Sequence, residues 1–272
     1  MKRLVLCAIS LVFAVTPARA QEGSNPRSDA PIINPSETRT SSPLTDRQKD
    51  EMRAQILMAR KDYVEAVQAY GELLKSDPKN SQMLNQMGIA YQELGDLGEA
   101  ERSYKKAFHS DKTYASAVNN LGALEYSKKH YRKAIKYYRK AIAMPDGDRA
   151  VIYSNLGFAY FGNVEYAPAM AAFGKALALD PDIFSRKSGT GAIVQQRSAP
   201  DPGMLYFLVA KSYAKAGDAE HAAHFLKVAR DDGYKNFVAA KTDPDFARVI
   251  KDRRVQEVFD IQPVFSSGEN KL

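Results

Sequence analysis

The stretches MGIAYQELGDLGEAERSYKKAF (Met87 to Phe108) and LGALEYSKKHYRKAIKYYRKAI (Leu121 to Ile142) decide the fold of this chain. When the second stretch is placed on the first at an offset of 34 residues, small and aromatic residues coincide at helical spacing. The coinciding pairs are Gly88 with Gly122, Ala100 with Ala134, Tyr104 with Tyr138, and Ala107 with Ala141. A fixed period of this length indicates helix pairs that bury their apolar faces only by stacking on their neighbours.

Three further copies extend the pattern in both directions along the chain. The copy LGFAYFGNVEYAPAMAAFGKALALDPD (Leu156 to Asp182) follows at 35 residues. The copy ARKDYVEAVQAYGELLKSDP (Ala59 to Pro78) precedes the others and matches best in its second half. A last copy, MLYFLVAKSYAKAGDAEHAAHFLKVA (Met204 to Ala229), comes after a spacing of 53 residues instead of 34, which indicates an insertion before it. About five helix pairs are therefore predicted.

The recurring small, aromatic and proline positions resemble the tetratricopeptide repeat (TPR). Small residues at the helix crossing, such as Gly88 with Ala100, are expected to let the two helices of a pair approach closely. The pairs Asp77-Pro78 and Asp180-Pro181 are expected to end second helices, because proline cannot continue the hydrogen-bond ladder. The resemblance implies an all-α fold, a right-handed α-solenoid of helix-turn-helix repeats with a concave groove.

Composition and repeat spacing divide the chain into segments. Residues 1–20 have a basic start, a short apolar run and an Ala-Arg-Ala end, which is typical of a signal peptide. Residues 21–45 are rich in Ser, Pro, Asn and Thr and are predicted to be a disordered linker. The other ranges are predicted to be TPR-like repeats 1–4 (46–182), an inserted loop (183–202), repeat 5 with a C-terminal helical cap (203–262), and a flexible tail (263–272).

The predicted signal peptide changes the chemistry that the exported chain can use. It contains Cys7, the one cysteine of the sequence, so disulfides and cysteine-ligated metals are excluded from the exported part. It also contains three basic residues and no acidic residue, so the formal net charge falls from +7 to +4. The sequence predicts export of a bacterial type, to the periplasm or the medium, and this modest charge does not indicate nucleic acid as a partner.

Catalytic, cofactor and metal sites are not predicted. His221 and His224 stand one helical turn apart, a spacing that can chelate a metal, but they flank packing positions and have no evident third ligand nearby. The segment SGTGA (Ser188 to Ala192) lacks the Gly-Lys-Ser/Thr ending of a phosphate-binding loop. No nucleophile, base and orienting group occur together, so the chain is predicted not to be an enzyme and to need no cofactor.

Binding along the predicted groove is the stronger hypothesis. In the family that the repeats resemble, the first helix of each pair lines the groove, and this role carries over by equivalence. The resulting groove candidates are Gln86, Asn120, Tyr126, Asn155, Phe158, Phe161 and Phe207. Gln86, Asn120 and Asn155 occupy one equivalent slot. A ladder of side-chain amides there either pairs with the backbone of an extended peptide or holds neighbouring helices together.

The stretch from Tyr131 to Ile142 contains five Lys and Arg, three Tyr and no acidic residue. On a helical wheel its apolar residues form one stripe, which predicts the packing face of a second helix. The basic residues on the other side are Arg132, Lys133, Lys136, Arg139 and Lys140. Because the aromatic residues of the stripe are expected in the core, the stretch is predicted to be framework with a solvated basic face. An acidic partner or an anionic envelope surface is the alternative.

Together these features predict a non-enzymatic scaffold or adaptor of the cell envelope that binds extended peptide segments of another protein in the groove. The alternative is a structural subunit that self-associates through the solenoid ends or the insertion. Some relatives of this repeat type grip a C-terminal carboxylate with a lysine-centred clamp. Glu51, Asn85 and Asn119 stand where the leading clamp lysine and its equivalents would be expected, so this chemistry is not predicted.

Overall fold

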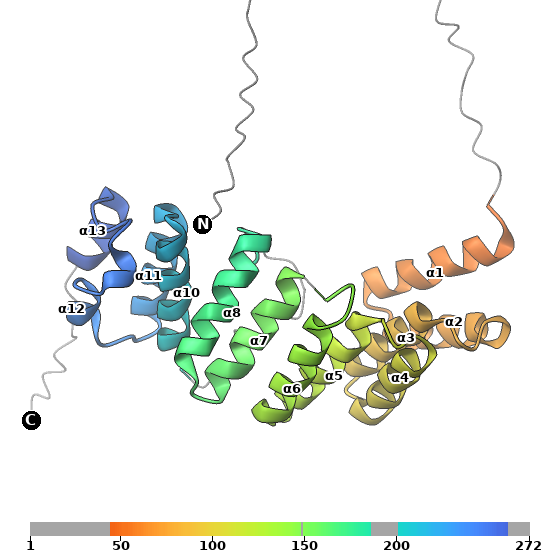
Figure 1. Ribbon diagram of the computed structural model, residues 1–272. Helices are drawn as coiled ribbons and strands as arrows, with labels where there is room; N and C mark the ends of the chain where they lie inside the picture. Colours follow the sequence, from red (N-terminus) through yellow and green to blue (C-terminus); the bar gives the residue numbers. More distant parts are fainter. Residues whose placement is uncertain (1–43, 148, 186–200, 261–272) are drawn as a thin grey trace, which may run out of the picture. The chain divides into compact units, whose positions relative to one another are not determined.

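The computed structural model describes residues 44–147, 149–185 and 201–260, and the regular structure of those residues is helical (Figure 1). The predicted signal peptide (1–20) and tail (263–272), and most of the predicted linker (21–45) and insertion (183–202), lie outside the described residues. None of the described helices combines the length and the apolar character that crossing a membrane requires.

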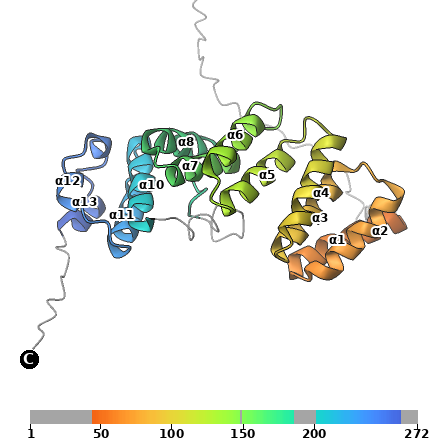
Figure 2. The same ribbon diagram turned by 90° about the horizontal axis from the view of Figure 1, so that it is seen from below.

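The helices pair in chain order, and each pair packs against the next (Figure 1, Figure 2). The pairs are α1 (Asp46–Arg60) with α2 (Tyr63–Ser76), α3 (Ser81–Glu93) with α4 (Leu97–Ser110), α5 (Ala115–Ser127) with α6 (Tyr131–Ile142), α7 (Ala150–Gly162) with α8 (Tyr166–Leu179), and α10 (Pro202–Ala216) with α11 (Ala219–Asp231). The chain then continues through α12 (Phe237–Ala240), the 3-10 helix η1 (Pro244–Phe246) and α13 (Arg253–Asp260), which form the C-terminal cap. The predicted all-α repeat solenoid is confirmed.

The ends of the helices follow from local sequence. Asp77 and Asp180 end α2 and α8 with φ angles of −138° and −154°, outside the helical range that a following proline disfavours. Asn80 then caps α3, because its side chain accepts a hydrogen bond of 3.0 Å from the backbone N–H of Met83. The predicted Asp-Pro stops therefore end both second helices, and Asp77-Pro78 leads directly into the next pair.

Glycine at the crossing of a pair allows an aromatic ring to lie directly on the backbone of the first helix. A Cβ added to Gly88 would lie 2.6 Å from the ring of Tyr104, which occupies the next turn of α4 after Ala100. The same arrangement recurs where Tyr138 covers Gly122 and where Phe173 covers Gly157, at 2.7 Å and 2.3 Å. The expected close approach is present, but the residue that meets the glycine is the aromatic ring rather than the alanine.

The second helices divide into a buried stripe and an exposed stripe, as α6 shows. Ala134, Ile135, Tyr138 and Ala141 are buried, whereas the five basic side chains of the helix are exposed. The predicted packing face is therefore buried, and the predicted basic face is exposed, as both interpretations of that face require. An apolar core runs on continuously from α5 to α13, and smaller clusters lie beneath α1 to α4.

The C-terminal cap docks on α10 through buried rings. Phe246 of η1 is completely buried, and its ring centroid lies 5.9 Å from that of Phe207 on α10 and 5.6 Å from that of Phe259 on α13. Tyr234 also stacks on Phe207, with the two ring centroids 4.1 Å apart. One aromatic cluster therefore joins α10 to both ends of the cap.

An ion-pair cluster fixes the same junction. Lys211 of α10 is largely buried, and its Nζ lies 2.7 Å from a carboxylate oxygen of Asp243 and 2.9 Å from one of Asp245. Burial by itself raises the pKa of Asp245, but the hydrogen bonds from Lys211 and Lys215 outweigh it and lower that pKa below its usual value. The Asp-Pro-Asp-Phe segment thus supplies both the acidic groups and the buried ring that attach the cap.

Candidate functional site

The predicted amide ladder occupies one equivalent position on the first helices, a position that recurs in four successive pairs. Met52, Gln86, Asn120 and Asn155 occupy it at spacings of 34, 34 and 35 residues. Met52 is 47% exposed, Gln86 and Asn120 are half-buried, and Asn155 is only 2% exposed. Access to this slot therefore decreases along the chain and ends at α7.

Asparagine side chains join three first helices through a continuous hydrogen-bonded network. The Nδ2 group of Asn120 on α5 donates to Oδ1 of Asn85 on α3, at 2.9 Å. The Nδ2 group of Asn155 on α7 donates to Oδ1 of Asn119, at 3.0 Å, and Asn119 donates in turn to Oδ1 of Asn120, at 3.2 Å. The sequence left open whether these amides pair with a peptide or hold neighbouring helices together. In these contacts the amides of Asn120 and Asn155 hold neighbouring helices together.

Five of the seven predicted groove residues have buried side chains. The exposed fractions are Tyr126 5%, Asn155 2%, Phe158 0%, Phe161 2% and Phe207 4%. In this conformation they are core residues that a bound peptide would not reach, which corrects their predicted place on the groove surface. Gln86 and Asn120 alone among the seven keep partial exposure.

The burial of the aromatic candidates has identifiable causes. Phe158 lies 6.1 Å from Phe184, at the start of the inserted segment, and Phe207 lies under Tyr234 of the cap region. Both covering residues belong to segments outside the repeat pattern, so repeat equivalence could not reveal them. Within the repeats, Tyr126 packs edge-on against Tyr131 at 5.4 Å, and this burial raises the pKa of the Tyr126 hydroxyl.

An accessible, uncharged face remains on α1, α3 and α5. It comprises Gln55, Gln82, Gln86, Ile89 and Ala123, which are exposed or half-buried. Gln55, Ile89 and Ala123 are equivalent by the repeat offset, and Gln82 lies one turn before Gln86. Within the part of the chain that the structure describes, the amides of Gln55, Gln82 and Gln86 have no hydrogen-bond partner, so both their donors and their acceptors remain available. We call these five residues the amide face.

The sequence analysis did not single out Gln55 and Gln82. The signal that could have found them is the repeat offset itself, applied to the helix positions on either side of the Gln86 slot. Their exposure also depends on their early place in the chain, because the equivalent of Gln55 in the fourth repeat is the buried Phe158.

Asn120→Ala is expected to lower the free energy of unfolding by about 1–2 kcal/mol. The substitution removes two hydrogen bonds and leaves Oδ1 of the buried Asn85 without its donor. Urea denaturation measures the loss. Gln86→Ala is the matched control, because it truncates the preceding residue of the same slot without breaking a hydrogen bond, and its effect is expected within about 0.5 kcal/mol of zero. Equal losses from both variants would contradict a structural role for the network.

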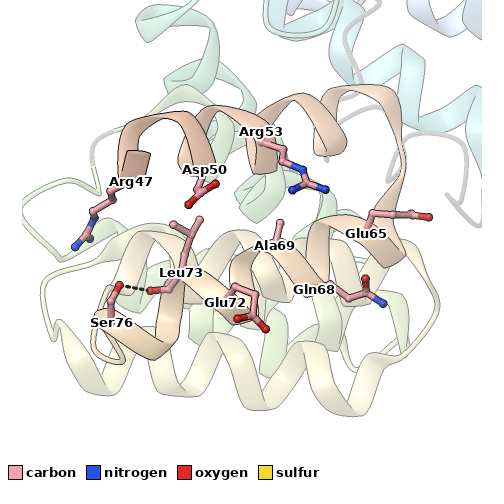
Figure 3. Close-up of a pocket in the computed structure, with 9 residues that line it drawn as sticks. All are labelled: Arg47, Asp50, Arg53, Glu65, Gln68, Ala69, Glu72, Leu73 and Ser76. Carbon is pink, nitrogen blue, oxygen red and sulfur yellow. Dashed lines mark hydrogen bonds between the residues drawn. The ribbon is translucent and has the colours of Figure 1, made fainter. Parts of the chain in front are cut away.

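A cavity of about 860 Å³ lies between α1 and α2 at the outer side of the first pair (Figure 3). Asp50 and Arg53 point into it from α1. The equivalent positions of the next pair are the apolar Leu84 and Met87, which contribute to packing between pairs. The first pair therefore presents charged residues where later pairs present apolar residues to their predecessors, which is the polar outer face expected of a terminal repeat.

Of the two histidines on α11, His221 takes part in packing and capping. The ring of His221 stacks on Tyr213 with centroids 4.8 Å apart, and its Nδ1 lies 2.7 Å from a carboxylate oxygen of Asp218, the N-cap of the helix. His224 is exposed at the surface of the same helix. Among the described residues, no cluster of three or more His, Cys, Asp or Glu side chains could hold a metal ion.

Comparison with known proteins identifies the repeats. Two sequence models of the tetratricopeptide repeat match, one at residues 57–124 and the other at residues 115–146 and 150–183. The chain is 29% identical over 86 residues to Hsp70-Hsp90 organizing protein 1 of Glycine max, covering 32% of this chain and 15% of that protein. It is 23% identical over 186 residues to BBSome complex member BBS4 of Bos taurus, covering 63% and 36%. The chain thus spans well under half the length of these curated relatives.

Solved structures share the fold. The structure of PilW, a widely conserved type IV pilus biogenesis factor, superposes with a TM-score of 0.51 at 20% identity, covering 79% of this chain and 91% of that chain. The structure of pilF of Pseudomonas aeruginosa superposes with a TM-score of 0.50 at 19% identity, covering 78% and 88%. At these identities the likeness concerns the arrangement of the helices.

Proposed function

We propose that this chain, which carries tetratricopeptide repeats at residues 57–146 and 150–183, is a non-enzymatic adaptor that binds extended segments of other proteins. Repeat folds of this type are scaffolds whose stacked helices present one long surface to a partner. The partner surface that we assign is the amide face on α1, α3 and α5. It replaces the longer groove lining predicted from the sequence, because the first helices of the fourth and fifth pairs have buried side chains there.

The observation that carries the proposal is the set of unengaged amides at Gln55, Gln82 and Gln86. A side-chain amide donates and accepts at once, so it can pair with the N–H and C=O groups of an extended backbone whatever the side chains of that segment. Ile89 and Ala123 add apolar contacts from the first helices α3 and α5. This combination favours recognition of backbone shape over recognition of charge.

The amide face contains no cationic residue, and this determines which kind of peptide end it can bind. A carboxylate clamp needs lysine or arginine on the first helices, and the expected positions hold Glu51, Asn85 and Asn119. Asn85 and Asn119 belong to the asparagine network, and Glu51 pairs with Arg47 at 3.0 Å. Capture of a C-terminal carboxylate by such a clamp is therefore not part of the proposed function.

The cell envelope is the proposed location, and it rests on the signal-peptide pattern of residues 1–20. The alternative function is self-association through the solenoid ends or the insertion. Most of the insertion lies outside the described residues, and the two ends offer less support for self-association. Charged side chains line the outer side of the first pair, and the cap covers α10 and α11 of the last pair. Sedimentation separates the two functions, since an adaptor is expected to remain monomeric as its concentration rises.

Site-specific photo-crosslinking tests the adaptor function directly. A photoreactive residue is placed at Gln82, which is exposed on α3, and the chain is irradiated in its native envelope fraction. We expect discrete crosslinked products that contain other proteins. The matched control carries the same photoreactive residue at Lys227, which is exposed on α11 away from the amide face, and should not give these products.

A second arm tests the amides themselves. In the crosslinking background, Gln55→Ala with Gln86→Ala should weaken partner capture at least about fivefold, as expected from the loss of two hydrogen-bonding groups. Identical products from positions 82 and 227 would refute the assignment of the face. Products that contain only further copies of this chain would refute the adaptor function and support self-association.

A further inference from the structure

The positive charge of the chain is concentrated in its second and third helix pairs. Residues 97–142 contain eleven Lys and Arg but only four Asp and Glu, an excess of seven. The formal net charge of the whole sequence is +7, so the acidic and basic side chains of all other residues balance. One stretch of 46 residues therefore accounts for the whole excess.

A ring on α4 brings two of these charges together, one from α6 and one from the α4–α5 loop. Lys140 of α6 places its Nζ 4.1 Å from the ring centroid of Phe108 on α4, and Lys112 approaches the same ring at 4.6 Å. Lys106 and Lys140 are equivalent by the repeat offset, so they occupy the same position on neighbouring second helices. We define the basic face as Lys106, Lys112, Arg132, Lys136, Arg139 and Lys140.

The cations of the basic face are not neutralised within the chain. In the described residues, none of the six forms an ion pair with a carboxylate. Of the four acidic residues in this stretch, three are engaged by other cations: Glu99 pairs with Arg102, Glu101 with Lys105 and Lys128, and Glu125 with its own cluster of cations. The fourth, Asp111, accepts hydrogen bonds from Thr113. Holding several like charges together without partners costs stability, so an external anion would relieve the repulsion.

The composition of the basic face favours a charged surface over a protein partner. Protein interfaces have an apolar core enriched in aromatic residues and methionine and depleted in lysine. Among residues 97–142, no large hydrophobic side chain is exposed. Four of the six cations lie on α6, one on α4 and one in the α4–α5 loop, and most are lysines, which act as mobile point charges. Such a face is suited to a surface that presents many separate anionic groups, rather than to a single binding pocket.

We propose that the basic face docks the chain onto an anionic phospholipid surface. Each Lys or Arg held near such a surface contributes about 1 kcal/mol, so several together can retain a folded domain without an inserted anchor. The amide face lies on first helices and the basic face on second helices and the α4–α5 loop, so their residues are separate. Lipid docking thus goes beyond the adaptor function and can be tested independently of it.

Vesicle co-sedimentation of the purified chain tests the proposal. We expect binding to phosphatidylcholine vesicles that contain phosphatidylglycerol, no binding to vesicles of phosphatidylcholine alone, and loss of binding as salt screens the charges. The triple substitution Arg132→Gln, Lys136→Gln and Arg139→Gln should weaken binding at least about tenfold. Glutamine preserves helix propensity, and circular dichroism verifies that the variant is folded.

The matched control removes the same charge elsewhere. Lys175→Gln, Lys227→Gln and Lys235→Gln are exposed substitutions outside the basic face, and the affinity of this variant should stay within about twofold of the parent chain. Equal losses in both triple variants would show a mere net-charge effect and overturn the proposal. So would equal binding to neutral vesicles, or binding of poly-glutamate or DNA by a chain that ignores phosphatidylglycerol.

Discussion

Phe246→Ala should lower the free energy of unfolding by about 3–5 kcal/mol, the range for truncating a fully buried aromatic ring. Phe246 is 0% exposed, and it contacts one ring from α10 and one from α13. Its removal leaves a cavity in the aromatic cluster through which the cap meets α10. Denaturation followed by circular dichroism measures the loss.

The position of Phe246 determines how the loss should be distributed. Undocking of the cap would uncover Phe207, whose ring the cap residues shield, and would leave Lys211 without Asp243 and Asp245. Hydrogen exchange of α10 and α11 should therefore accelerate more than that of α3 and α4. This gradient follows from the stacked fold, in which each pair contacts only its neighbours.

Phe237→Ala is the control within the cap. Phe237 belongs to the same aromatic group but is half-buried, at 5.6 Å from Tyr234 and 6.1 Å from Phe259. The same atoms are removed from a site that water partly reaches, so the loss should be clearly smaller. Equal losses from the two variants, or an unchanged exchange rate in α10, would contradict the role of Phe246 as the attachment point of the cap.

Much of the fold could be predicted from the sequence because the period carries redundant information. The Asp-Pro pairs, the glycines and the alternating faces of α6 each indicate the same helix pairs, and the structure contains all of them. The cap was also predictable, since Asp243 to Phe246 follow the last repeat with helix-breaking and helix-starting residues.

The candidate site was less predictable, for two physical reasons. Equivalence between repeats predicts only the contacts that repeats make with one another. Phe184 and Tyr234 come from outside the repeats, and they bury Phe158 and Phe207. The asparagines posed a different problem. An amide can bond to a peptide or to another amide with the same chemistry, and only the distance from Asn120 to Asn85 distinguishes the two.

Gly157→Ala should lower the free energy of unfolding by about 1–3 kcal/mol, although alanine is the better helix former. The new Cβ would lie 2.3 Å from the ring of Phe173. That ring cannot move aside easily, because Phe158 and Phe184 each lie 5.3 Å from it and all three are buried. Gly174→Ala, on the paired helix α8, meets no atom within 4 Å and should instead raise stability by about 0.5–1 kcal/mol. Thermal unfolding of the two variants should therefore shift in opposite directions.

The fifth pair indicates how the clash at Gly157 can be relieved. At the positions equivalent to Gly157 and Phe173 it has Ala210 and Leu226, both completely buried. A methyl group on the first helix is thus accommodated where the facing side chain is smaller than a ring. The double variant Gly157→Ala with Phe173→Leu should consequently lose less stability than the two single variants added together. The smaller leucine relieves the clash with the new methyl group, and the methyl group fills part of the space that the ring leaves. Strict additivity would mean that the ring does not press on the glycine, and that glycine recurs at this crossing for some other reason.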